Sequence, residues 1–543
     1  MPKLTLSRCL NSLALLTLAV VFGWAAWERF RLPLTPFVDP DVWAYLGPAL
    51  DTLLGERFRN WFGQCFLYPW FLYILLRLGS NFRWITLVQG LHGLGTGALL
   101  FAGWMELRRL LPASRVPAFV FKLLGAELVA VYLFSTATIQ FERTLRPESV
   151  FPFVVILQVY CNLHFIRACL LEGRRSRFLL SGGSAVFLSI AASLLKPSFS
   201  GALLLANLPT IIFLFWTDQP LRCKFPLVAV PVVAAALLLL WPESTFRQRD
   251  PTASRYLFES LFSIHADLIN KQMEQDLTGH AVTPYPPQSL ASTHTALTEA
   301  LHDSRGENGK YWPALGFNPD YLRFGGPGKP PFLRQLTSLL GNEDQTAEFC
   351  RYYYWRTMRG QPAGMAVKIA RQFAVFYSPW NCPAYLTYKS FSLAEQYRQG
   401  TACLISQPKL QRYSAGATLL ADATALTDSP LRIGPYKLTG WINRFLSKTH
   451  LCWCLWAGLL TVFAWRKPSL FAFRKVAPVL LLLYGYNFGT VLMLAIGHSL
   501  DVGRYSQYQF AYTLLPDFVS IWLTIEALLL TANYWKHQPR AGG

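Results

Sequence analysis

Charged residues are scarce in this chain of 543 residues, at 15% of the total, and only 30 of them are acidic. Soluble globular chains carry about 25% charged residues, so the scarcity argues against a soluble protein. Hydrophobic residues instead make up 52% of the sequence, and the mean hydropathy is +0.27. The composition predicts an all-α polytopic membrane protein.

Two further absences narrow the class. The chain lacks a basic stripe with interleaved aromatic residues, so a formal net charge of +20 does not indicate nucleic-acid binding. Its basic residues form short clusters between apolar runs, as in cytoplasmic loops. The first apolar run, Leu10–Trp27, lacks a small-x-small cleavage site because Trp24-Ala25-Ala26-Trp27 is bulky at both ends. We expect an uncleaved membrane anchor.

Some short motifs lack the partners that a chemical role would need. The glycines between Gly90 and Gly97 lie inside an apolar run with no strand before them. Close helix packing therefore explains them better than nucleotide binding does. Cys452 and Cys454 lie in another apolar run without further metal ligands. Neither motif predicts a site.

Apolar runs long enough to cross a bilayer, which takes about 20 residues, occur in both halves of the chain. The candidate spans are Leu10–Trp27, Trp84–Met105, Pro117–Ala137, Ser149–Leu170, Phe178–Leu195, Phe199–Trp216, Phe225–Trp241, Leu451–Trp465, Val476–Gly497 and Phe510–Thr531. A shorter run, Cys65–Leu78, decides the topology. If it lies in the interface, every dense basic loop falls on the cytoplasmic side, as the positive-inside rule requires. This arrangement predicts about ten spans with both termini cytoplasmic.

The spans divide the chain into three parts. Residues 1–241 form an N-terminal transmembrane module with a first outer loop at 28–83. Residues 242–450, rich in Pro, Gly and Tyr, form an extracytoplasmic domain of mixed structure, and residues 451–543 form a C-terminal module. Met365–Tyr377 has an amphipathic helical pattern, which suits either a helix on the membrane surface or one packed on the core of the outer domain.

Four cations are expected on the outer side, against the positive-inside rule: Arg143, Arg146, Lys196 and Arg504. The acidic residues Asp41, Glu142, Glu148 and Asp501 accompany them, and Asp39 lies two residues before Asp41. Cations held there beside carboxylates suggest a site for an anionic lipid headgroup, because Arg and Lys pair well with phosphate. The alternative is local ion pairing, for example between Glu142 and Arg146 one helical turn apart.

The segments that carry these charges resemble the outer loops of GT-C membrane glycosyltransferases. Pro40–Tyr45 is similar to their first loop, Leu145–Glu148 to their second acidic element, and His498–Tyr505 to a late loop of many bacterial members. Protein O-mannosyltransferases (family 39) and aminoarabinose transferases are the parallels. The likeness covers roughly residues 1–240 and weakly the last two spans. The chain departs from the pattern in its Asp-Pro-Asp sequence and in the lack of a lysine near Tyr68-Pro69.

The resemblance implies a GT-C-like fold in a bacterial inner membrane with the active site on the periplasmic face. It implies transfer of a sugar from a polyprenyl-phosphate donor to an acceptor that is a lipid, a glycan or a protein. Membrane lipids would surround the protein as further partners. Asp41 would be the general base, with Glu148 orienting a substrate, and Arg146, Lys196 and Arg504 would bind the donor phosphate. Supporting residues would be Asp39, Tyr45, Arg143, His498, Asp501 and Tyr505. The Asp39-x-Asp41 spacing permits a divalent cation without requiring one.

Two other functions compete with this interpretation. A polysaccharide polymerase or ligase would also use outer-loop Arg and His but would not need Asp41. A transporter or lipid flippase would need ionisable residues near the bilayer midplane and interrupted helices in two related halves. The charges in this sequence cluster at the outer rim instead.

Four cysteines, Cys65, Cys350, Cys382 and Cys403, fall on the outer side, where disulfides are permitted. Cys382 and Cys403 are about 20 residues apart, and closing such a loop stabilises a fold by about 3 kcal/mol. We expect these two to be bonded and Cys350 to be reduced or buried.

Overall fold

The computed structural model is almost entirely helical, as predicted for an all-α protein. It describes residues 2–58, 66–169, 175–216, 220–241, 244, 252–306, 315–326, 328–379, 382–385, 390–497 and 502–537. Strand structure in these ranges consists of β1 (Phe391–Ser392) and β2 (Arg432–Ile433), which pair antiparallel with Phe391 opposite Ile433.

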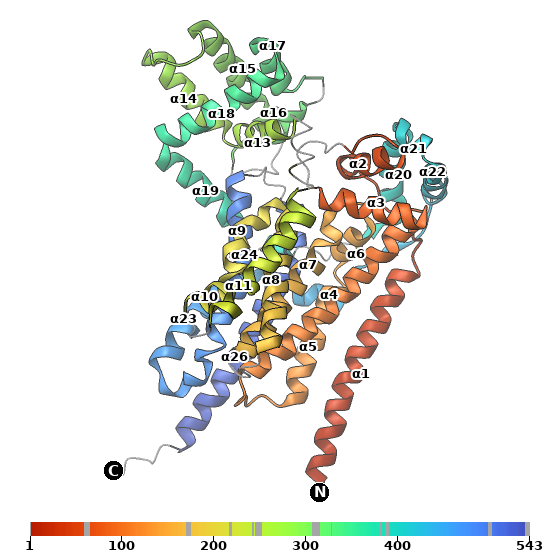
Figure 1. Ribbon diagram of the computed structural model, residues 1–543, viewed down its shortest axis with the longest axis vertical. Helices are drawn as coiled ribbons and strands as arrows, with labels where there is room; N and C mark the ends of the chain where they lie inside the picture. Colours follow the sequence, from red (N-terminus) through yellow and green to blue (C-terminus); the bar gives the residue numbers. More distant parts are fainter. Residues whose placement is uncertain are drawn as a thin grey trace.

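The helices of the apolar segments, long and short, lie side by side in one elongated bundle (Figure 1). They are α1 (Pro2–Phe30), α4 (Arg83–Leu110), α5 (Ala118–Leu133), α6 (Thr136–Arg143), α7 (Phe151–Arg167), α8 (Arg175–Leu195), α9 (Ser200–Ala206), α10 (Leu208–Trp216), α11 (Leu221–Ala235), α23 (Lys437–Arg466), α24 (Ala477–Gly497) and α26 (Phe510–His537). Among the described residues, 6 helices are long and apolar enough to cross a membrane, or 7 if α5 and α6, bent by 52°, count as one. The chain is a multi-pass membrane protein.

Every predicted span coincides with helix in this bundle, although some spans are broken. Phe199–Trp216 is divided into η4 (Pro197–Phe199), α9 and α10, and α11 continues into η5 (Ala236–Leu240). The start of α1 and the end of α26 lie at the same end of the bundle (Figure 1). This arrangement fits an even number of crossings, and about ten spans with cytoplasmic termini stays a prediction.

The first outer loop folds into two helices at the opposite end of the bundle from the termini. α2 (Trp43–Leu53) and α3 (Leu67–Gly79) pack on each other, and α3 lies across the top of the bundle (Figure 1). An interfacial position for the Cys65–Leu78 run stays a prediction, and Cys65 itself is outside the described residues.

The outer segment 242–450 differs from the predicted single domain of mixed structure, because its described part forms two separate helical bodies (Figure 1). The first, called here the helical domain, comprises α13 (Thr252–Ile264), α14 (Ala266–Thr278), α15 (Pro287–Gly306), α16 (Pro319–Phe324), α17 (Phe332–Leu340), α18 (Glu343–Gly360) and α19 (Pro362–Phe376). The second, called the cap, comprises α20 (Leu393–Ile405), α21 (Pro408–Arg412) and α22 (Ser414–Ala425). α23 then runs unbroken across the boundary predicted after residue 450.

Ion pairs fasten the cap to the first outer loop. Arg412 lies 2.8 Å from Glu56, Lys409 pairs with buried Asp51 of α2, and Arg83 lies 2.9 Å from Asp422. The hydroxyl of Tyr397 also donates a 2.6 Å hydrogen bond to the carbonyl of Thr35. The cap therefore holds the loop that carries Asp39 and Asp41.

The helical domain is joined to the bundle through α19 and α24. Phe373 of α19 packs on Phe488 with ring centroids 4.9 Å apart, and the hydroxyl of Tyr377 donates to Asn487 at 2.7 Å. Lys368, on the polar face of the amphipathic pattern, is buried and pairs with Asp267. Of the two interpretations left open for Met365–Tyr377, the structure favours a packed helix.

Two glycines allow α9 and α24 to touch backbone to backbone. A Cβ atom on Gly201 would lie 2.2 Å from the carbonyl oxygen of Gly489, and one on Gly489 would lie 2.5 Å from that of Gly201. Close approach of this kind is the usual role of small residues between membrane helices. The contact fixes the start of α9, which follows Lys196 after the short turn η4.

The predicted bond between Cys382 and Cys403 is wrong, because both thiols are free. Cys382 begins the turn η6 (Pro383–Tyr385), and its backbone N–H donates to Ser447 of α23 at 3.0 Å. Cys403 lies in the cap. The two segments are close in sequence but belong to different bodies. Cys350 is free and fully buried, as predicted.

Candidate functional site

Three of the outer loops use the same local structure to place a charged residue. Asp39, Arg146 and Lys196 each precede a proline, and each stands just before a short 3₁₀ turn that the proline begins. Their φ angles are −137°, −141° and −139°. The residue before a proline is driven to extended backbone, while the proline favours the start of a helical turn. Each X-Pro step therefore places a charged residue in extended backbone directly before a helical turn.

Backbone pairing brings the first two of these loops together. The N–H of Phe37 donates to the carbonyl of Arg143 at 2.7 Å, and the N–H of Leu145 donates to the carbonyl of Phe37 at 3.3 Å. Phe37 and Thr144 form an isolated parallel bridge. Asp39 and Arg146 each lie two residues beyond this bridge, so their side chains meet.

The predicted charged residues converge in one ion-paired cluster. Asp41 Oδ2 lies 2.7 Å from Arg504 Nη1 and 3.1 Å from Arg146 Nη2. Glu148 Oε1 lies 2.8 Å from Lys196 Nζ and 2.9 Å from Arg504 Nε. Arg504, in α25 (Val502–Tyr508), therefore bridges the two carboxylates.

The two carboxylates of the cluster, Asp41 and Glu148, differ in how far their side chains are exposed. The side chain of Asp41 is 54% exposed, whereas that of Glu148 is 0% exposed. Asp41 can meet a substrate, but Glu148 is enclosed between Lys196 and Arg504. In this geometry Glu148 contacts the two cations, and the substrate-orienting role that the sequence suggested stays a prediction.

Burial and charge shift the pKa values of the cations. Burial lowers the pKa of Lys196 to about 8. The positive charge of Arg504 adds to this decrease, while the negative charge of Glu148 acts in the opposite direction. Burial also acts to lower the pKa of Arg504, but Glu148 outweighs it and raises that pKa above the ordinary value. Lys196 is therefore the cation of the cluster whose charge responds to mildly alkaline pH.

Aromatic rings surround the cations. Lys196 Nζ lies 5.6 Å from the ring centre of Tyr505 and 5.2 Å from that of Tyr508, which are distances typical of cation–π contacts. Tyr45 is buried and packs edge-on against Tyr68 with centroids 5.5 Å apart. Sequence reasoning singled out Tyr45 and Tyr505 but missed Tyr508, whose position three residues after Tyr505 on a short helix was the available signal.

A hydrogen-bond chain behind Tyr68 supports the second loop. Gln89 Nε2 donates to Tyr68 at 2.7 Å and to Ser149 Oγ at 2.6 Å, and Ser149 Oγ donates to the carbonyl of Arg146 at 2.6 Å. Sequence reasoning missed Gln89, because a single glutamine inside an apolar run gives little indication of where it points.

Other predicted site residues lie elsewhere. Arg143 contacts the carbonyl of Arg29 at 3.4 Å and the ring of Phe37 at 5.7 Å, outside the ion-paired cluster. Glu142 is buried and pairs with Arg29 of α1 at 2.7 Å, and the pairing with Arg146 that sequence spacing suggested does not form. Arg146 extends to Asp39 and Asp41 instead. His498 and Asp501 lie outside the described residues.

The Asp39 and Asp41 pair is already neutralised by arginine. Asp39 Oδ2 lies 2.6 Å from Arg146 Nε, and Asp39 Oδ1 accepts from the N–H of Asp41 at 3.0 Å, which caps the first turn. Across the described residues, no group of three or more His, Cys, Asp or Glu side chains could hold a metal ion. The donors present suit an anion that displaces a carboxylate from arginine better than a divalent cation.

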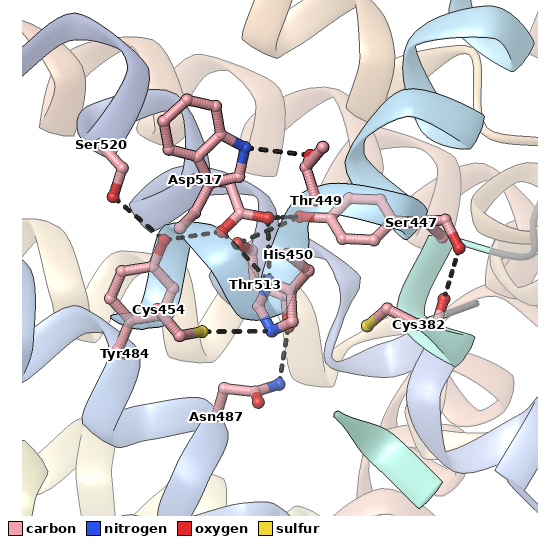
Figure 2. Close-up of polar contacts among 12 residues, drawn as sticks. Cys382, Ser447, Thr449, His450, Cys454, Tyr484, Asn487, Thr513, Asp517 and Ser520 are labelled. Atoms are coloured by element: carbon pink, nitrogen blue, oxygen red, sulfur yellow. Dashed lines mark hydrogen bonds and ion pairs between the residues drawn. The ribbon is translucent and has the colours of Figure 1, made fainter. Parts of the chain in front are cut away.

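A second polar cluster is buried among the helices and centred on Asp517 of α26 (Figure 2). Its carboxylate pairs with His450 Nδ1 at 2.9 Å, accepts from the hydroxyl of Tyr484 at 2.7 Å and accepts from the hydroxyl of Tyr385. Cys454 Sγ lies 3.6 Å from the other nitrogen of the same imidazole. Tyr385 belongs to η6, so Asp517 anchors an outer segment within the membrane bundle.

The sequence suggested that charged residues cluster at the outer rim of the membrane spans. The structure corrects this, because Asp517 and Glu526 of α26 are fully buried within the bundle. Glu526 accepts from the N–H groups of Arg115 at 2.7 Å and Val116 at 3.2 Å. Both carboxylates have protein partners that cross-link distant segments. Their arrangement is that of structural ties and does not by itself support a transport path.

Comparison with known proteins does not assign a function to this chain, so a function has to be argued from the site. No protein-family model and no curated protein matches the chain. Among solved structures it is similar to the crystal structure of ArnT from Cupriavidus metallidurans bound to undecaprenyl phosphate. The match has 13% sequence identity and a TM-score of 0.33, and it covers 89% of this chain and 77% of that one. A TM-score of this size is too low to establish a shared fold.

We predict that Asp517→Asn destabilises the protein. Hydrogen bonds to a charged group contribute about 1.5–3 kcal/mol each, and an amide cannot accept from all of the donors around this position. The free energy of unfolding in detergent micelles should fall by at least about 3 kcal/mol. Ser520→Ala is the control, because Ser520 lies on the same helix and contacts only Tyr484 of this group, at 3.0 Å. Unchanged stability of Asp517→Asn would contradict an anchoring role.

Proposed function

We propose that this protein is a membrane glycosyltransferase that moves a sugar from a polyprenyl-phosphate donor to a hydroxyl acceptor on the non-cytoplasmic side of the membrane. The observation that carries the proposal is the cluster of Asp41, Arg146, Lys196 and Arg504. These residues come from separate loops and meet at the end of the bundle opposite the termini. Their motifs are also those that resemble the GT-C outer loops.

The cations suit a lipid phosphate at headgroup level. Arg146 and Arg504 are exposed in part, at 11% and 20%, and both contact Asp41 through the same carboxylate oxygen. A phosphate that enters the cluster would compete for these two guanidinium groups, which pair with phosphate in two-pronged geometry. Lys196, held by Glu148 and the tyrosine rings, supplies a third positive charge.

Displacement of Asp41 from arginine would also prepare it as the base. The freed carboxylate takes the proton of the acceptor hydroxyl while that oxygen attacks the anomeric carbon. The new glycosidic bond forms as the bond from the anomeric carbon to the phosphate oxygen breaks, and the electron pair leaves with the phosphate. Arg146, Lys196 and Arg504 stabilise the charge that develops on the leaving phosphate. Attack from the opposite face gives inversion.

We predict that Asp41→Asn lowers sugar transfer by about 10²–10⁴-fold, the usual cost of losing a general base. Transfer would be measured with purified protein and a radiolabelled polyprenyl-phosphate sugar. The side chain is 54% exposed, so folding should not change. Asp428→Asn, at a 92% exposed carboxylate in the loop after the cap, is the matched control and should retain activity.

The same two variants, Asp41→Asn and Asp428→Asn, distinguish the proposed glycosyltransferase from the rival enzyme class. A polysaccharide polymerase or ligase does not need Asp41, so near-normal turnover of Asp41→Asn would overturn the proposed base and favour that class. Loss of turnover in both variants would point to a general defect instead.

We predict that donor binding weakens above about pH 8, where Lys196 loses its proton. The KM for the donor should rise there, and Lys196→Arg, which stays charged, should move the rise to higher pH.

The free energy of unfolding should increase over the same pH range in which donor binding weakens. The depressed pKa of Lys196 means that the unfolded chain binds more protons than the folded chain between about 8 and 10.5, so this group favours folding more as pH rises through that window. An alkaline limb identical in both proteins would contradict the assignment of Lys196.

A further inference from the structure

The helical domain contains a cleft that the cluster at Asp41 does not use. Its volume is about 1010 Å³, at the upper end of the range of about 300–1,000 Å³ typical of small-molecule sites. The walls come from α14, the segment before α15, the end of α17 and one face of α18. These helices form the body farthest from the termini in Figure 1.

Aromatic rings form one part of the cleft. Tyr285 and Tyr352 meet edge to face with centroids 5.6 Å apart, and Trp355 follows on α18. Trp355 is 46% exposed although it is a large apolar side chain. A ring left exposed beside other rings offers a flat apolar surface of the kind that the C–H face of a sugar covers.

Arginines form the other part. Arg356 is held in place because Asp276 binds it through two contacts, at 2.5 Å to Nε and 2.7 Å to Nη2, and Asp276 also accepts from Gln272 at 3.0 Å. The side chain of Arg359, one turn from Trp355, is exposed and makes no hydrogen bond or ion pair with any residue that the structure describes. Arg351 also lines the cleft and lies 3.7 Å from Glu348. With Arg356 paired to Asp276, the charge of Arg359 leaves the cleft net positive.

We propose that this cleft binds an acidic oligosaccharide, one that bears uronic acid or phosphate groups. Rings beside fixed guanidinium and amide groups offer both stacking and paired hydrogen bonds, which match a sugar's apolar face and its hydroxyl or acid groups. The volume suits several sugar units. Single-stranded nucleic acid would use similar groups, but the cleft lies on the side of the bundle away from the termini, where an extracytoplasmic glycan is the expected polymer.

The domain is linked to the ion-paired cluster, so the bound saccharide would be the acceptor if the proposed function holds. His265, between α13 and α14, contacts the carbonyl of Ile496 at 3.0 Å. Ile496 lies near the end of α24, and the chain passes from there to Arg504 in α25. A glycan held by the cleft would thus lie on the same side of the membrane as Asp41.

The test measures binding without relying on transfer. Full-length protein in detergent would be applied at physiological salt to an array of acidic oligosaccharides, neutral oligosaccharides of equal length and single-stranded DNA. We expect binding to acidic oligosaccharides only. Trp355→Ala and Arg359→Gln should each weaken it by at least about tenfold, the effect of losing one charged hydrogen bond or one stacking contact. Arg334→Gln, at an exposed arginine of α17 outside the lining, is the control and should bind normally.

Each outcome decides between explanations. Binding to no acidic oligosaccharide, preference for DNA, or full affinity in both cleft variants would overturn the proposal. Asp41→Asn should bind the array as the native protein does. If the native protein binds acidic oligosaccharides but transfers no sugar, the cleft proposal holds and the proposed function fails. If the native protein transfers sugar but does not bind the array, the proposed function holds and the cleft proposal fails.

Discussion

The outer end of the molecule depends on one buried carboxylate. Glu148 has no exposed side-chain surface and would be costly to bury alone, because an unpaired charge in a protein interior loses its hydration without compensation. Lys196 and Arg504 supply that compensation at 2.8 and 2.9 Å. They come from the end of α8 and from α25, so neutralising Glu148 requires distant parts of the chain to meet at one point.

Other contacts in the structure position the segments that meet at Glu148. The glycine contact between α9 and α24 sets the height of the turn after Lys196, and the bridge between Phe37 and Thr144 sets the position of the first loop. Asp517 anchors η6, which packs against α25 and so supports Arg504 from below. Asp41 is the exposed member that completes the arrangement. Three carboxylates, of Asp39, Asp41 and Glu148, face three cations in this cluster. Under the proposed function, a phosphate that enters would compete with Asp41 for the two arginines and so free the proposed base.

Much of the membrane part was predictable from sequence, because long apolar runs and basic loops follow directly from the energetics of the bilayer. The X-Pro steps after Asp39, Arg146 and Lys196 also marked the outer turns. Asp517 was not predictable as an anchor, since its partners Tyr385 and His450 lie far away in sequence. The division of residues 242–450 into two helical bodies was missed for a similar reason. Their separation depends on which distant loop each body packs against, and the Cys382–Cys403 expectation failed with it.

The most direct measurement is a cryo-electron microscopy structure of the full-length protein with bound polyprenyl phosphate. The account predicts phosphate density in contact with Lys196, Arg504 and Arg146, with the carboxylate of Asp41 turned away from the two arginines. Phosphate density away from these side chains, with the Asp41 ion pairs unchanged, would contradict it.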